Sequence, residues 1–413
     1  MRADDQSRAR LQPDFKVKMK IKAHRLLQCP REFALLLCCI LLAGCAQTPP
    51  PPVRQVLEAT APVELLVATN TSAENELLDI GVVVFTSAVS EEQSNEADAW
   101  LFAEISRKET QFLPYVLRNT LIASNHWGAV RVLPENDPSV DLLVYGTIFQ
   151  SDGEVLDLGI QVFDSTGREW LNKRYLEVAA MLDYPDTTRY TTGRRFDPNN
   201  FIDPFQDIYD QIANDMQSVR SGLDSNSLAE VKLVSELLYA NDLAPESFAE
   251  NLQVNADGTR TIASLPASAD PMRERVEAIR LRHYLFIDTV DDYYRALYDE
   301  MQPAYVLWRR FSLEQNQITA ADQQQVFNED NYSDSNNYLA LIQRYDRFRW
   351  SKIYEQEFTE LASGFNNEIA PAILELNQQV HGLSGSLESQ YRQWRSILRE
   401  MFHLESGLPP ATR

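Results

Sequence analysis

Residues 79–178 alternate between short apolar stretches and turns in the way that β-strands do, with one helical stretch among them. The opening run, 79–85, is apolar and β-branched, which predicts a central strand buried on both faces. Helical spacing of apolar residues predicts a helix over about 97–124, which Pro114 should kink or restart. Further strands, of which the last three are joined by turns containing Asp and Gly, are expected at 129–133, 141–148, 155–163 and 170–178. This order predicts a mixed sheet with one helical face.

From Asp203 the pattern becomes helical almost to the end of the chain. Asp203 and Pro204 suit the N-cap and first turn of a helix, and Asp257-Gly258 predicts a small hairpin. Helices are expected at 203–222, 225–240, from 270 to about 315 with a bend at Pro303, then after a polar segment at 338–380 and 387–401. The predicted fold class is therefore α+β: a small mixed α/β sheet domain followed by an elongated antiparallel helical bundle.

The N-terminal region has the pattern of a secretory signal peptide. A basic stretch precedes the apolar run 33–42, which is shorter than the ~20 residues that a membrane-spanning helix needs. Leu42-Ala43-Gly44-Cys45 ends this run and resembles the bacterial lipobox. The resemblance implies cleavage before Cys45 and acylation of that residue, as in lipoproteins carrying diacylglyceryl and palmitate groups. A signal anchor with a chance cysteine is the alternative, and Met19 is an alternative start of the signal.

Composition excludes several classes of function for the processed chain. All four cysteines lie at or before the cleavage point, at positions 29, 38, 39 and 45, so disulfides and cysteine-bound zinc are not expected. Residues 1–45 hold nine Lys and Arg against four Asp and Glu, so the net charge falls from −22 for the whole chain to −27 for the remainder. Such a charge repels nucleic-acid phosphates and anionic lipid surfaces. Membrane attachment must therefore come from the acyl chains.

Three features of residues 79–178 resemble a known type of domain. They are the opening strand 80–85, the strand 141–148 with Asp, an apolar run, Gly and Ile in order, and the hairpin 162–170. Together they resemble the small α/β domain of the curli-secretion lipoprotein, of the penicillin-binding-protein activator lipoproteins and of the N-terminal part of the Tol–Pal β-propeller protein. The resemblance covers about a quarter of the chain. It implies a domain that binds partners or oligomerises and performs no chemistry.

The pattern divides the chain into six segments with different expected roles. They are a signal peptide at 1–44, a lipidated cysteine and Pro-rich tether at 45–76, the α/β partner-binding domain at 77–180, a basic turn-rich loop at 181–204, the helical bundle at 205–405 and a tail at 406–413. The loop contains Arg189, Arg194 and Arg195 in an otherwise acidic chain. Two uses of these arginines are left open: ion pairs within the chain, and docking of an anionic partner.

No motif for catalysis, cofactor binding or metal binding is recognisable. The sequence lacks a Gly-rich phosphate loop, a dinucleotide fingerprint, a His-Glu-x-x-His pair and a Gly-x-Ser-x-Gly elbow. His283 falls on an apolar stripe and is expected to be a hydrogen-bonded core residue. The acidic pairs Asp291-Asp292 and Asp299-Glu300 are expected on a solvated helix face. The aromatic residues of the helical part are expected in the core.

These patterns favour a protein that is not an enzyme and that needs no cofactor. We expect an outer-membrane lipoprotein facing the periplasm, with exposure at the cell surface left open, because Ala46 rather than Asp follows the cysteine as in lipoproteins sent to the outer membrane. It would act as a partner-binding or assembly factor, through an envelope protein or a second copy of itself. A periplasmic hydrolase of peptidoglycan or glycan with a carboxylate cleft is the alternative.

We predict that Cys45→Ser blocks acylation and leaves an unprocessed or soluble form, because the thiol is the only site that can receive the lipid. Fractionation of envelopes and labelling with a fatty-acid analogue measure both effects. Persistence of the variant in the outer-membrane fraction would show that Cys45 is not the anchor.

Overall fold

The computed structural model describes most of the chain beyond the tether. The chain divides into two compact units, 1–56 and Leu57–Arg413, and all described residues belong to the second. The described residues are 57–69, 73, 76–88, 99–184, 202–267, 270–326, 373–376 and 379–408.

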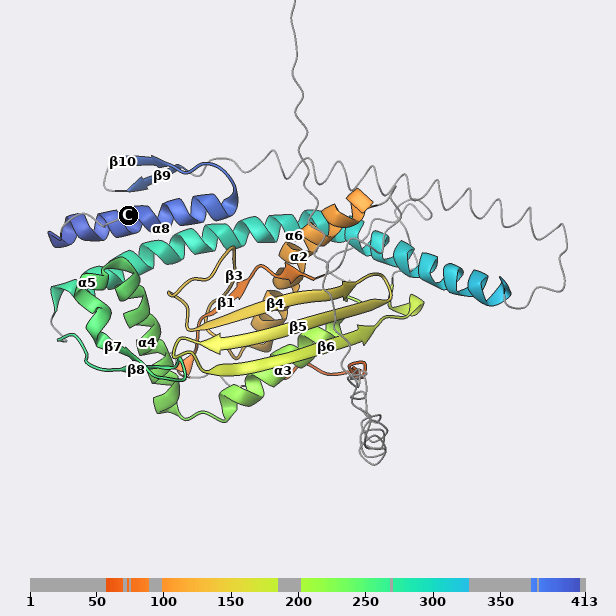
Figure 1. The fold of residues 1–413 in the computed structure, drawn as a ribbon, viewed down its shortest axis with the longest axis horizontal. Helices are drawn as coiled ribbons and strands as arrows, with labels where there is room; N and C mark the ends of the chain where they lie inside the picture. The colour runs from red at the N-terminus through yellow and green to blue at the C-terminus, as the bar shows by residue number, and fades with distance from the viewer. Residues whose placement is uncertain are drawn as a thin grey trace, which may run out of the picture. The chain divides into compact units, whose positions relative to one another are not determined.

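A six-stranded mixed sheet forms the centre of the second unit (Figure 1). Its main path runs β3-β1-β4-β5-β6, and β2 pairs with β4. The strands are β1 (Ile80–Val83), β2 (Thr86–Ser87), β3 (Val130–Leu133), β4 (Leu142–Ser151), β5 (Val155–Asp164) and β6 (Glu169–Val178). Strand β1 is parallel to β3 and β4, whereas β4, β5 and β6 form antiparallel hairpins. The five main strands expected from the sequence are thereby confirmed, and so is the mixed sheet.

Helix α2 (Ala99–Ser124) lies between β2 and β3 in the chain and packs against β1, β3 and β4. Pro114 lies inside this helix without ending it. Proline has no N–H, so the carbonyl of Thr110, four residues earlier, lacks its usual helical donor. The backbone N–H of Phe85 donates to that carbonyl at 2.8 Å. The proline therefore frees an acceptor that ties α2 to the chain leaving β1.

Helix α6 (Pro271–Val326) covers the outer edge of β3. The backbone N–H of Val132, on this edge strand, donates to Asp291 Oδ1 at 2.8 Å, and Arg131 donates to Asp288. An uncovered edge would leave such groups available to another chain. Pro303 lies within α6, whose axis changes direction in its C-terminal half (Figure 1).

The remaining helices pack on the sheet and on α6. Helix α3 lies against β6 and α2, α4 contacts α6, and α8 packs along α6. Their bounds, with those of the short elements, are α3 (Gln206–Ser221), α4 (Ser225–Leu243), α5 (Pro245–Phe248), β7 (Leu252–Val254), β8 (Arg260–Ile262) and α8 (Leu387–Ser406). Strands β7 and β8 form the hairpin predicted over Asp257-Gly258. Buried residues of the sheet and of these helices belong to one hydrophobic core, so a separate elongated bundle is not clearly shown.

Three details of the helical part differ from the sequence prediction. Helix α3 begins at Gln206 rather than at Asp203, and α6 continues to Val326 through the expected polar break. Part of the predicted 338–380 helix instead forms strands β9 (Ile373–Leu376) and β10 (Gln379–Gly382), which pair antiparallel. Short apolar runs fit both periodicities, which is why this assignment was wrong. Residues 327–372 lie outside the described part.

Residues 57–68, which the sequence analysis includes in the tether, run as an extended strap across the folded unit. The N–H of Thr60 donates to the Leu176 carbonyl on β6, and the N–H of Ala68 donates to the Ser124 carbonyl at the end of α2. Between these points, the side-chain amide of Asn214 on α3 accepts from the N–H of Leu66 at 2.8 Å and donates to the Glu64 carbonyl at 2.9 Å. One side-chain amide therefore forms hydrogen bonds with two backbone groups of the strap.

We predict that Asn214→Ala loosens the strap, because it removes both hydrogen bonds, each worth ~0.5–1.5 kcal/mol. Amide hydrogen exchange at Leu66 should accelerate several-fold while exchange in β4 and β5 stays unchanged. Asn214→Asp is the matched control, since it keeps the acceptor for Leu66 and loses only the donor. Unchanged exchange at Leu66 in the alanine variant would mean that Asn214 does not hold the strap.

Candidate functional site

The site residues proposed from the sequence lie outside the described part of the structure. This applies to Cys45 and to Arg189, Arg194 and Arg195. The two cations just upstream of that loop are described, and both are paired within the chain. Lys173 binds Asp215 at 2.7 Å and Arg174 binds Asp157 at 2.6 Å.

The described ends of the arginine-containing loop are held by Arg309 on α6 and by the β4–β5 turn that packs against it. Arg309 is 1% exposed and lies 3.6 Å from Asp203, at the C-terminal end of the loop. At the N-terminal end, the Tyr184 hydroxyl donates to the Gly153 carbonyl in the β4–β5 turn. A Cβ on Gly153 would collide with the Arg309 carbonyl, so only glycine fits there. The loop base is therefore fixed against α6 and the sheet.

A second charge lies beside Arg309 in the same interior. Glu109 on α2 accepts hydrogen bonds from the hydroxyls of Tyr305 and Ser151, and Arg309 donates to Ser151. Burial raises the pKa of Glu109, against the opposing effect of Arg309 and the two hydroxyls. The Arg309 guanidinium also stacks over the ring of Phe205 at 4.7 Å. The cluster joins α2, β4, α6 and the start of α3 with no solvent-facing reactive group.

A buried Asp–His–Tyr group connects the other half of α6 to α8. His283 Nε2 lies 2.7 Å from Asp137 Oδ2, which also accepts from the Tyr391 hydroxyl at 2.6 Å. Burial alone would raise the pKa of Asp137, but the charge and hydrogen bond of His283 hold it well below its usual range. His283 and Asp137 are fully buried, so the prediction of a hydrogen-bonded core histidine is confirmed. The geometry resembles a catalytic dyad but gives a substrate no access.

Asp291 corrects one expectation from the sequence. Asp299, Glu300 and Asp292 are exposed as expected, but Asp291 is buried and pairs with Arg118 at 2.6 Å. Neighbouring helix positions point about 100° apart, so adjacent aspartates can face water and the sheet edge respectively. Among the described residues, no group of three His, Cys, Asp or Glu side chains is placed to hold a metal ion. No helix in the described ranges is both long and apolar enough to cross a membrane.

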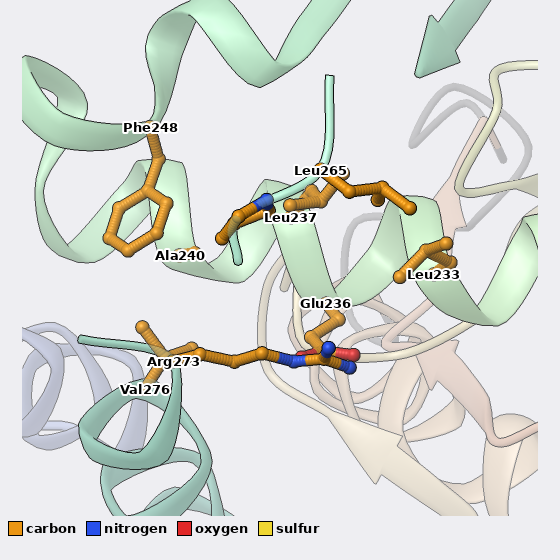
Figure 2. A pocket seen from close by; sticks show the side chains of 9 residues that line it. Leu233, Glu236, Leu237, Ala240, Phe248, Leu265, Arg273 and Val276 are labelled. Atoms are coloured by element: carbon orange, nitrogen blue, oxygen red, sulfur yellow. The ribbon is translucent and has the colours of Figure 1, made fainter. Parts of the chain in front are cut away.

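A pocket of about 230 Å³ lies between α4, α5, the start of α6 and the loop after β8 (Figure 2). Seven of its nine lining residues are apolar: Leu233, Leu237, Ala240, Phe248, Leu265, Pro266 and Val276. The other two, Glu236 and Arg273, form an ion pair at 3.1 Å. Figure 2 shows both of these side chains on one side of the cavity, with Leu265 opposite. The arrangement can hold an apolar group beneath a charge-neutral polar wall.

Sequence reasoning missed this pocket and the Glu109–Arg309 cluster. Helix α4 has apolar side chains all round, which indicates burial on more than one side. That signal could have predicted that α4 contacts apolar residues of several other elements, among them those of the pocket. The polar cluster gives no comparable signal, because Glu109 lies in the polar stretch 106–111 and Arg309 is followed directly by Arg310. Their partners come from elements more than 40 residues apart, which no local pattern reveals.

Glu177, near the base of the loop, should make the stability of the fold depend on pH. Burial raises the pKa of its carboxyl to about 8, reinforced by Asp207, Asp203 and Asp183, although the N–H of Ile208 donates to it. A carboxyl with a raised folded-state pKa contributes stability that is present below its unfolded value, ~4.3, and is lost as the pH rises through about 8. Glu177→Gln, which keeps an acceptor for Ile208 without the charge, should not suffer this loss.

We therefore predict that Glu177→Gln and the parent chain have similar stability near pH 4.5. Above pH 8 the variant should be more stable by ~1 kcal/mol or more, on a scale of ~1.4 kcal/mol per pKa unit. Chemical denaturation across this pH range measures the difference. Glu169→Gln, at an exposed position of the same strand, is the control and should show no such trend. A pH-independent difference for Glu177→Gln would contradict the raised pKa.

Of three comparisons with known proteins, the one with solved structures found a similar chain. No protein-family model matches the sequence, and no curated protein matches it either. Among solved structures, the chain is similar to a point variant of PelC from Paraburkholderia phytofirmans, described as a dodecamer. The match has 14% sequence identity and a TM-score of 0.17, and it covers 40% of this chain and 94% of PelC. At that TM-score, the match carries no argument about this chain.

Proposed function

We propose that this protein is an outer-membrane lipoprotein that faces the periplasm and binds a partner there. In this proposal Cys45 carries the lipid, and the strap joins the tether to the sheet unit. Helices α6 and α8 form an extended scaffold. The partner is another envelope protein or a second copy of this chain. The protein is not an enzyme.

The observation that carries the proposal is the lipobox followed by a short tether that leads into a fixed strap. From Cys45 to Thr60, the first strap residue with a backbone hydrogen bond to the sheet, there are fifteen residues. A fully extended chain spans at most ~3.6 Å per residue, so the sheet edge stays within ~54 Å of the acylated cysteine. The strap thus limits how far the unit stands from the membrane and which part of it is tethered.

The burial of titratable groups supports association rather than turnover. An acid–base site needs carboxylates or imidazoles that converge on a cavity reached by substrate. The two buried clusters around Asp137 and around Glu109 are closed to solvent. In the pocket of Figure 2, the titratable side chains are Glu236 and Arg273, which neutralise each other. A hydrolase of envelope polymers is the alternative, and its signature would be turnover by the purified chain.

The loop arginines provide the test of partner binding. We predict that replacing Arg189, Arg194 and Arg195 together by alanine weakens capture of an anionic partner in a cross-linking pull-down from intact envelopes. The remaining binding should lose much of its salt sensitivity, because salt screens the long-range attraction between charges that the arginines supply. Thermal stability should change little.

Two comparisons sharpen this test. Alanine at Arg295 and Arg392, whose side chains are 59% and 66% exposed, controls for loss of positive charge elsewhere and should leave capture unchanged. If the loop arginines only pair within the chain, capture survives and stability falls by ~0–1 kcal/mol per pair. Hydrolysis of peptidoglycan or glycan by the purified protein, abolished by a carboxylate substitution, would overturn the binding proposal altogether.

A further inference from the structure

The pocket of Figure 2 is lined by buried residues together with an exposed one, which is the form of a site that accepts an inserted group. Leu237, Ala240 and Val276 at its floor are at most 3% exposed. At the rim, Leu265 is 58% exposed, although it is a large apolar residue. An exposed leucine is ordinary on its own, but here it borders an apolar cavity, and contiguous exposed apolar surface marks interaction sites.

The volume of the cavity limits what it can hold. A cavity of ~150 Å³ accepts benzene, and drug-sized ligands need ~300–1,000 Å³. At about 230 Å³ this cavity lies between the two. It fits one bulky apolar group, such as the side chain of Leu, Phe or Trp. It is too small for a long acyl chain, such as the one expected on Cys45.

The polar wall gives a second constraint on the occupant. Arg273 binds Glu236 at 3.1 Å, and their side chains are 44% and 27% exposed. Because the guanidinium is already paired, it offers no unbalanced positive charge to a fatty-acid carboxylate or a phosphate. The pair does offer N–H donors and carboxylate acceptors side by side at the cavity. That combination complements the N–H and C=O groups of a peptide backbone.

From these constraints we infer that the pocket between α4, α5 and α6 binds one bulky apolar side chain of a partner protein, whose flanking backbone contacts the Glu236–Arg273 pair. This inference rests on the proposed partner-binding function and assigns it a site. An aromatic or aliphatic side chain inserted in a well-packed pocket is the usual energetic centre of a protein interface. None of the lining residues is one of the loop arginines, so the pocket and the arginines can be substituted independently.

The first experiment uses N-acetyl-tryptophanamide as a probe, because it carries a bulky apolar side chain between two amides. Saturation-transfer NMR with the processed chain, 45–413 with Cys45→Ser to avoid detergent, should show transfer to the indole protons. Ala240→Leu fills the floor and should abolish the signal. Leu265→Ser alters only the exposed rim, so it should fold normally and weaken binding at least threefold. Leu281→Ser is the matched control, since Leu281 is 62% exposed and does not line the cavity.

The second experiment places a photo-cross-linking amino acid at position 265 or 281 in cells. A discrete adduct should form from position 265 and disappear when Ala240→Leu is added, and position 281 should give none of this adduct.

Absence of probe binding overturns the inference, as does displacement of the probe by dodecanoate at lower concentration, which would indicate a lipid site. An adduct unaffected by Ala240→Leu also overturns it, and so does the absence of an adduct at 265. If the chain still captures a partner through other positions, the proposed function stands and only this site is wrong.

Discussion

The fold depends on how the polar side chains of α6 are satisfied inside the protein. His283 meets Asp137, Asp291 meets Arg118 and the edge of β3, and Arg309 meets Asp203 and Ser151. Buried polar groups without partners are costly, so sliding the helix by one turn would break all of these contacts together. The pairs therefore fix the register of α6 against the sheet. They need not add net stability, because removing charges from water costs about as much as pairing them returns.

This register has consequences at both ends of α6. Near its start, it places Arg273 and Val276 beside α4 and completes the apolar pocket. Further along, Arg309 holds the base of the loop that contains the three arginines. One helix thus contributes to the pocket and to the base of the loop, and its contacts with β3 also cover the sheet edge.

The strap adds a constraint that hydrophobic packing alone does not provide. Its backbone is held by side chains of α3, chiefly Asn214 and Asp207, and by backbone bonds at its two ends. These bonds give the strap a direction from the β6 edge to the end of α2. They therefore fix where the chain joins the folded unit.

The sequence by itself determined the elements with strong local signals. The alternation and turn chemistry of residues 129–178 predicted the strands and hairpins, and helical periodicity predicted α2, α4, α6 and α8. It also determined the signal-like leader and the expected acylation at Cys45. It failed at 373–382, where short apolar segments fit a helix and a strand equally well.

Only the tertiary structure decided which polar residues are buried and where a cavity lies. Asp291 and Asp292 are neighbours with the same chemistry, but one faces the sheet edge and the other faces water. The pocket needs residues from three helices and a loop, from Leu233 to Val276. Local periodicity reports whether a residue is apolar. It does not report which distant element covers that residue, because that choice is made by the packing of the whole unit.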